Sequence, residues 1–252
     1  QMTVILKGKG QFLSGDYVGR FQPGDVFFLG ENAPHVFRSD EEYFDSAQGL
    51  ESEGNTVFFD FESLGKAVGE LEDLQSLKRF REFSGLCFQL IGETREKIFE
   101  IFENFSQSTG LLRFQLAIQL LALIENAQED LVPLNKINLK RGLSEKDGSR
   151  MDQVMQFLLE NRFQKISLDQ AASVAHLSRE AFCRFFKLRT RKTFTQYVLQ
   201  LRIQEAEKLL LETDLGIAEI AFRVGFENLS YFNRSFKALL GTSPLQFRKA
   251  SE

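Results

Sequence analysis

The residues of this chain that could do chemistry are basic and polar side chains that recur in two helical segments. Side chains three or four positions apart share one face of a helix, so they project from it together. On such a face, arginine, lysine and asparagine can donate to base edges and phosphates when the helix lies in the major groove of DNA. The outward residues are Arg179, Glu180, Cys183, Arg184 and Lys187 in the first segment, and Leu229, Ser230, Asn233, Arg234 and Lys237 in the second.

The two segments belong to a repeat with an offset of fifty residues. The offset aligns Ala171, Val174, Ser178, Phe182, Arg184, Phe186 and Lys187 with Ala221, Val224, Asn228, Phe232, Arg234, Phe236 and Lys237. Each copy predicts a short helix, a tight turn and a second helix that begins after an N-cap, Ser178 or Asn228. This is a helix-turn-helix, expected at about residues 168–188 and 217–239.

The packing of each motif follows from its small and apolar residues. Small residues on the first helix let the second approach closely, namely Ala171, Ala172 and Ala175 in one copy and Ala218 and Ala221 in the other. The core side of the second helix is expected to hold Phe182, Phe185 and Phe186, or Phe232, Phe236 and Leu239. A helix over 194–211 joins the copies. An all-α bundle with solvated basic faces is the alternative, and two matched copies disfavour it.

The elements before residue 151 are of a different kind. Up to about residue 60, short β-prone runs alternate with glycine-rich turns, which is typical of a small barrel or sandwich. Residues 94–127 show helical periodicity with a break at Gly110, which predicts a helical hairpin. Residues 129–150 are polar and aperiodic, and we expect a linker there. The fold class is therefore α+β with two domains, a β-rich one over 1–128 and an all-α one over 151–252.

Charge divides along the same boundary. The net charge of −4 conceals 15 Lys and Arg against 11 Asp and Glu in residues 151–252, a net of +4 in the part that would meet phosphate. No apolar run is long enough to span a bilayer and no secretory signal is visible, so we expect a cytoplasmic chain with reduced cysteines. Because the chain begins with Gln1 in a strand-like run, we also expect further sequence before it.

Residues 152–249 resemble the DNA-binding region of AraC/XylS-type transcription regulators. The resemblance rests on Leu177-Ser178 and Phe182-Cys183-Arg184-Phe185-Phe186-Lys187, and on Ile217-Ala218-Glu219-Ile220-Ala221, Val224-Gly225-Phe226, Tyr231-Phe232-Asn233-Arg234-Ser235-Phe236-Lys237 and Gly241-Thr242-Ser243-Pro244. It implies double-stranded promoter DNA as partner, with Arg184 the foremost base contact and Lys187 and Lys237 on phosphates. RNA polymerase is a further candidate partner. Arg191 departs from the family's usual glycine, so it must accept a left-handed conformation or end the helix differently.

The first part resembles the cupin-like sensor domain of such regulators, here incomplete at its start. The residues that carry this resemblance are Phe21-Gln22-Pro23-Gly24-Asp25-Val26-Phe27-Phe28-Leu29-Gly30 and Ala33-Pro34-His35. The resemblance implies a small effector such as a sugar, with His35 as a candidate contact, and a homodimer formed through the helices at 94–127.

Two other classes of protein remain as alternatives. A cupin-type metal-dependent enzyme would need several histidines, whereas this chain has only His35 and His176, so we expect no metal, no cofactor and no catalytic residues. A DNA-binding architectural protein without an effector would show no ligand-induced stabilisation.

Overall fold

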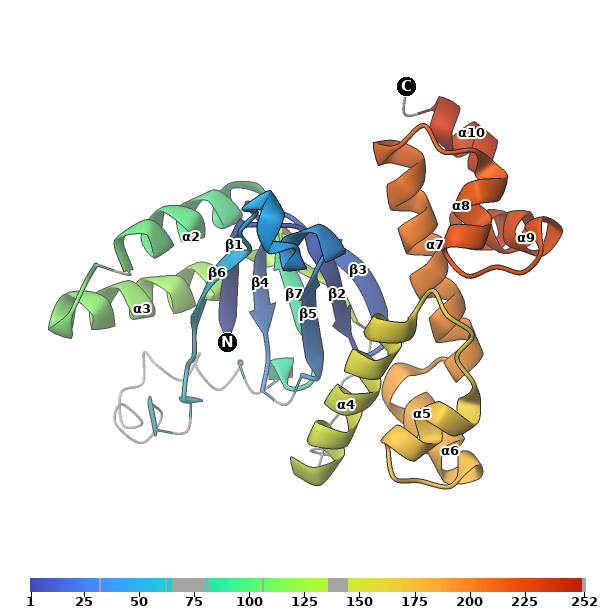
Figure 1. Ribbon diagram of the computed structural model, residues 1–252. Coiled ribbons are helices and arrows are strands. Elements are labelled where there is room, and N and C mark those ends of the chain that lie inside the picture. The colour runs from blue at the N-terminus through green and yellow to red at the C-terminus, as the bar shows by residue number, and fades with distance from the viewer. Residues whose placement is uncertain are drawn as a thin grey trace. The chain divides into compact units, whose positions relative to one another are not determined.

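The structure, a computed structural model, describes residues 1–31, 33–61, 63–64, 80, 82–105, 107–135 and 145–250. The chain divides into two compact units, Gln1–Gly148 and Ser149–Glu252. The first carries the strands and the second consists of helices (Figure 1). In the part of the chain that the structure describes, no helix combines the length and the apolar character needed to cross a membrane.

Two antiparallel sheets form the body of the first unit. The larger has the strand order β6-β1-β4-β7-β8 and the smaller the order β3-β2-β5. The strands are β1 (Met2–Lys7), β2 (Gly10–Ser14), β3 (Tyr17–Phe21), β4 (Val26–Leu29), β5 (His35–Ser39), β6 (Glu53–Val57), β7 (Cys87–Leu90) and β8 (Leu131–Pro133). The β-rich start is confirmed. Strands β7 and β8 were not predicted, because each has only three or four residues and follows a long separation in sequence.

Strand β4, in the middle of the larger sheet, is buried on both faces. Along a strand, successive side chains point to opposite faces. Val26 and Phe28 belong to a core shared with helices α2 (Gly92–Phe105) and α3 (Gly110–Glu125). Phe27 and Leu29 belong to a second core that includes Phe12 of the smaller sheet. The predicted hairpin of two helices is therefore confirmed, and it covers one face of the sheet.

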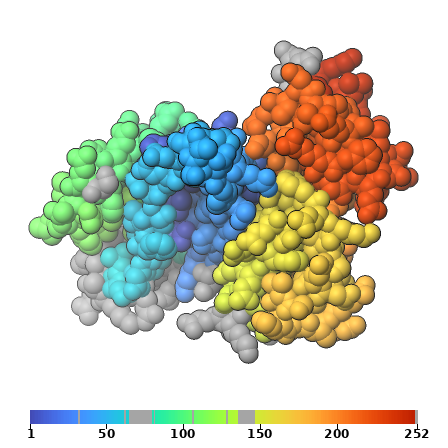
Figure 2. Space-filling model, in the orientation of Figure 1, coloured from blue at the N-terminus to red at the C-terminus, as the bar shows by residue number. Residues whose placement is uncertain are grey.

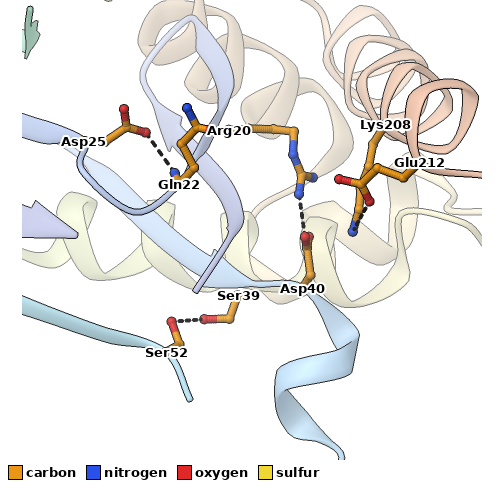
Figure 3. Close-up of polar contacts among 8 residues, drawn as sticks. All are labelled: Arg20, Gln22, Asp25, Ser39, Asp40, Ser52, Lys208 and Glu212. Atoms are coloured by element: carbon orange, nitrogen blue, oxygen red, sulfur yellow. Dashed lines mark hydrogen bonds and ion pairs between the residues drawn. The ribbon is translucent and has the colours of Figure 1, made fainter. Parts of the chain in front are cut away.

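Polar contacts fix the turns and edges of the smaller sheet. Arg20 on β3 donates to Asp40, which follows β5, and the Asp25 carboxylate accepts from the backbone N–H of Gln22 at 2.8 Å (Figure 3). Burial raises the pKa of Asp25 above its usual value. Two short 3₁₀ turns, η1 (Glu41–Phe44) and η2 (Ser46–Gln48), lead from β5 to β6.

The linker predicted for 129–150 is wrong at both of its ends. Its first residues complete η4 (Gln128–Asp130) and form β8, which pairs with β7. The amide of Asn135 is buried, accepts the N–H of Cys87 at 2.8 Å and donates to Gly85 at 3.0 Å. Its last residues begin helix α4 (Glu145–Asn161). Residues 136–144 lie outside the described residues. The prediction failed because a polar side chain that satisfies a buried backbone group, such as that of Asn135, is of the same residue type as the polar side chains of a solvated linker.

The second unit is all-α, as predicted. After α4 come α5 (Leu168–Val174), α6 (Arg179–Thr190), α7 (Phe194–Glu212), α8 (Ile217–Arg223), α9 (Leu229–Leu240) and α10 (Pro244–Lys249). Helices α5, α7 and α10 each begin with a capping box, in which Ser167, Thr193 or Ser243 exchanges hydrogen bonds with a glutamine three residues later. In Figure 2, α4–α6 form a yellow lobe and α8–α10 a red one.

Candidate nucleic-acid interface

Matching aromatic cores position the second helix of each motif. In the first motif, the ring of Phe186 lies 5.5 Å from that of Phe182 and 5.4 Å from that of Tyr197 on α7. In the second, the ring of Phe236 lies 5.7 Å from that of Phe232 on the same helix and 5.7 Å from that of Phe247 on α10. Edge-to-face and tilted rings at these separations are favourable. Each core thus fixes one face of α6 or α9 and turns the opposite face to solvent.

Two predicted core residues of the second motif are not in the core. Leu239 is 46% exposed and Ala218 is also exposed. Ser235 and Ile220 are buried in their place. An apolar residue at the end of a short helix fits the apolar pattern but lies beyond the partner helix, so the pattern alone misassigns it. The remaining small and aromatic residues predicted for both cores are buried.

All five predicted residues on the outward face of α6 are exposed: Arg179, Glu180, Cys183, Arg184 and Lys187. Glu180 is engaged by the start of its own helix. Its own backbone N–H and the Ser178 hydroxyl lower the pKa of its carboxyl group. Arg179 lies 3.8 Å from Asp169. Arg184 and Lys187 therefore share this exposed face with the carboxylate of Glu180, which is held at the start of the helix.

The outward face of α9 is less charged. Leu229, Ser230, Arg234 and Lys237 are exposed and Asn233 is half-buried. Tyr231, which is not one of the predicted outward residues, is also exposed, and its ring lies 5.8 Å from that of Phe226. The signal for it was an aromatic residue one turn before Arg234 on a helix whose core is already filled.

The structure corrects the register of the repeat. In the first motif the N–H of Leu177 donates to Ala172 at 3.0 Å, and in the second the N–H of Phe226 donates to Ala221 at 3.0 Å. The first helices and turns therefore correspond at an offset of 49, and the second helices at 50. Ala172, not Ala171, is the counterpart of Ala221. The second turn has one additional residue, Glu227, before its N-cap Asn228.

Helices α6 and α9 both end in a left-handed residue. Arg191 has φ 55° and Gly241 has φ 77°, and each donates its N–H to a lysine carbonyl four residues earlier. Of the two exits left open for Arg191, the chain therefore adopts the left-handed one. Helix α6 accordingly ends as α9 does, although only α9 has the glycine that favours this geometry.

The two histidines lie in different units. His35, on β5 of the first unit, has Nδ1 2.8 Å from the carbonyl of Ala33 and Nε2 3.1 Å from the side-chain nitrogen of Gln1. His176 is exposed in the first helix-turn-helix turn. Within the described residues, no group of three or more His, Cys, Asp or Glu side chains could hold a metal ion.

Comparison with known proteins agrees with this geometry. Residues 171–250 match the family described as helix-turn-helix domain. The Msm operon regulatory protein of Streptococcus mutans is 26% identical over 246 residues, which cover 97% of this chain and 82% of that protein. The activator RhaS of an Enterobacter species is 28% identical, over 69% of this chain and 66% of that one.

Other relatives match over a smaller part of their length. The regulator YdeC of Bacillus subtilis is 30% identical over 60% of this chain, and the match spans half of its own length. A crystal structure of the AdpA DNA-binding domain with a target DNA is 29% identical, covers 40% of this chain and 91% of that chain, and superimposes with a TM-score of 0.39. The family match lies wholly within the second unit, where the two motifs are.

Proposed function

We propose that this chain is an AraC/XylS-type transcription regulator that binds double-stranded DNA sequence-specifically through α6 and α9, the second helices of the two motifs in the region that matches the helix-turn-helix family. One observation carries the proposal. Two motifs with equivalent aromatic cores leave equivalent faces exposed, and each face presents an arginine and, three residues later, a lysine. One arginine can donate two hydrogen bonds to the same guanine in the major groove, and lysine binds phosphate.

Within this proposal the outward residues have distinct roles. Arg184 and Arg234 read base edges, whereas Lys187 and Lys237 hold the backbone. Leu229, Ser230 and Asn233 complete the reading face of α9, and Cys183 is a small contact between charged neighbours on α6. Glu180 accepts from a cytosine amino group, because the hydrogen bonds from its own helix start leave further acceptor positions on its carboxylate.

The test is binding to an operator obtained by selection of the full chain on random DNA. Arg184→Ala and Arg234→Ala should each weaken binding by about 1–3 kcal/mol and relax specificity at one position, whereas Lys187→Ala should reduce the salt slope by about 1 without changing specificity. Lys249→Ala removes one exposed charge at the end of α10 and serves as control. If both arginine variants bind the operator with the affinity of wild type or of the Lys249→Ala control, the proposed base contacts are refuted.

For the first unit we propose a sugar-like effector, with His35 as a contact. One relative is named for a sugar operon, the melibiose operon regulatory protein of Escherichia coli, which is 31% identical over 102 residues, or 40% of this chain and 34% of its own length. Sugars should raise the melting temperature of the chain, and His35→Ala should abolish that rise. If no small molecule stabilises the chain, the architectural alternative becomes the better one. Retention of a stoichiometric transition metal by the purified chain would reopen the enzyme alternative.

We further propose that the chain dimerises through α2 and α3 and acts in the cytoplasm on promoters bound by RNA polymerase. Helix α3 exposes Leu111, Leu112 and Phe114 near its start. Contiguous exposed apolar side chains are typical of protein-binding surfaces. Sedimentation of the wild-type chain should show a dimer, and Leu112→Glu should shift it to a monomer without altering the helix content. A monomeric wild-type chain would refute this part.

A further inference from the structure

The second helix-turn-helix turn packs against the loop that leads into the first motif. This turn, residues 224–227, follows α8, and the loop, residues 162–167, joins α4 to α5. They are about sixty residues apart in sequence and belong to different motifs. We call their contact the motif junction.

Arg202, in the middle of α7, forms the centre of the motif junction. Its Nε donates to the carbonyl of Arg162 at 3.0 Å and one terminal nitrogen donates to the carbonyl of Gln164 at 2.6 Å. The other terminal nitrogen donates to the carbonyl of Gly225 at 2.8 Å. Burial lowers the pKa of Arg202, and the nearby Glu227 carboxylate opposes this shift only in part. Arginine nevertheless stays charged at any physiological pH. One planar, charged group therefore links the loop of the first motif to the turn of the second.

At Gly225 the backbones of the turn and of the opposing loop lie close together. Gly225 has φ 89°, and a Cβ placed there would lie 2.7 Å from the carbonyl oxygen of Phe163 and 3.0 Å from Cζ of Arg202. The side chain of Phe163 packs against the core of the second motif, which includes Phe226. The first turn has no such requirement, since its left-handed residue is the exposed His176. Glycine is thus needed where two motifs meet and not where one motif turns in solvent.

The additional residue of the second turn also lies at the motif junction. The carboxylate of Glu227 is 3.3 Å from Nζ of Lys165 on the opposing loop. Both side chains are largely exposed, so this pair contributes little stability by itself. It lies beside the Arg202 contacts and adds a second link between the same two segments.

A second arginine shows what a contact within one motif looks like. Arg248 on α10 donates to the carbonyls of Leu210, Thr213 and Leu215, at 3.3, 3.3 and 2.8 Å. These carbonyls belong to the end of α7 and the segment that leads into α8, which are the approach to the second motif alone. Arg202 and Arg248 thus each donate to three backbone carbonyls, but of the two only Arg202 joins the two motifs.

We propose that Arg202 is a positioning residue that fixes the separation and rotation of α6 relative to α9, so that the chain accepts operators with one spacing between its two contact segments. The proposal rests on the proposed function. Helix α7 packs into both cores, through Tyr197 in the first motif and Ile203 in the second, and the motif junction adds a direct link between the two motifs. This link limits bending and twisting of the pair before DNA is bound, so that binding to correctly spaced DNA costs less conformational entropy.

The first test measures spacing selectivity on the selected operator and on versions with one base pair inserted between the contact segments. One inserted pair rotates one segment by about 35° and moves it about 3.4 Å. We expect wild type and Arg248→Ala to lose about tenfold in affinity or more on insertion, the size of one lost base contact. For Arg202→Ala the loss should fall to about threefold or less. Arg202→Lys, which keeps the charge but not the fork, should resemble Arg202→Ala.

The second test needs no DNA. Nitroxide labels on Cys183 and on a cysteine from Lys237→Cys report the distance between α6 and α9. Cys87 is buried, so we expect it to remain unlabelled in the folded chain. The distance distribution should be narrow in wild type and Arg248→Ala and broad in Arg202→Ala and Arg202→Lys. Distributions that remain narrow, or an insertion penalty that persists in both Arg202 variants, would overturn the positioning role. Failure of wild type to select any DNA sequence, with narrow distributions intact, would count against the proposed function instead.

Discussion

Replacing Arg191 with glycine should stabilise the second unit. Arg191 ends helix α6 with φ 55°, a conformation that costs L residues roughly 1–2 kcal/mol and glycine almost nothing. Its side chain is exposed. Glycine also gains freedom in the unfolded chain, which offsets about 0.4–1 kcal/mol of the relief. We therefore expect Arg191→Gly to raise the free energy of unfolding by about 0.5–1 kcal/mol.

The reciprocal change at the equivalent position provides the matched control. Gly241 ends α9 with φ 77°, and no atom lies within 4 Å of the position that a Cβ would occupy. Gly241→Ala therefore meets no steric obstacle, and its expected loss of about 1 kcal/mol comes from backbone conformation alone. Arg191→Lys keeps both the charge and the unfavourable conformation, so its free energy of unfolding should equal that of wild type.

The measurement is thermal unfolding of the full chain followed by far-ultraviolet circular dichroism, which reports on the helices. For a unit of this size, Arg191→Gly should raise the midpoint by roughly 2–8 °C and Gly241→Ala should lower it by a similar amount. If Arg191→Gly leaves the midpoint unchanged or lowers it, the side chain stabilises the helix end and the argument from backbone strain fails. Operator affinity is measured separately, because Arg191 also carries a charge near the proposed interface.

Three further outcomes are expected. Cys183 should react with a thiol reagent in the folded chain and be protected by operator DNA, whereas Cys87, whose pKa burial raises to about 12, should react only on unfolding; equal rates for both thiols would contradict the burial of β7. Asn135→Ala should cost about 1–3 kcal/mol in urea unfolding because the buried N–H of Cys87 loses its acceptor, and a neutral result would show that Asn135 belongs to a linker after all. Leu239→Ser should change the unfolding free energy by no more than about 0.5 kcal/mol, unlike a core substitution, since Leu239 is exposed.

The sequence by itself determined the helix-turn-helix pair because the information is local. Caps such as Ser178 and Asn228 lie three residues from the N–H groups they satisfy. Phe182 and Phe186 are one turn apart on a single helix. The same pattern of caps and aromatic residues recurs fifty residues later, and a recurring pattern rarely arises by chance. The predicted helices accordingly agree with the observed ones to within about two residues.

Only the tertiary structure decided the features that depend on residues distant in sequence. Strand β8 exists because β7 supplies its hydrogen-bonding partner, and Asn135 is buried because Cys87 and Gly85 need its amide. The register of the repeat is another case, since side-chain types align equally well at offsets of 49 and 50 over a short helix. The hydrogen bonds of the two turns distinguish them. Likewise, nothing in the type of Arg202 reveals that it binds the carbonyls of two motifs, because backbone acceptors leave no mark on the sequence.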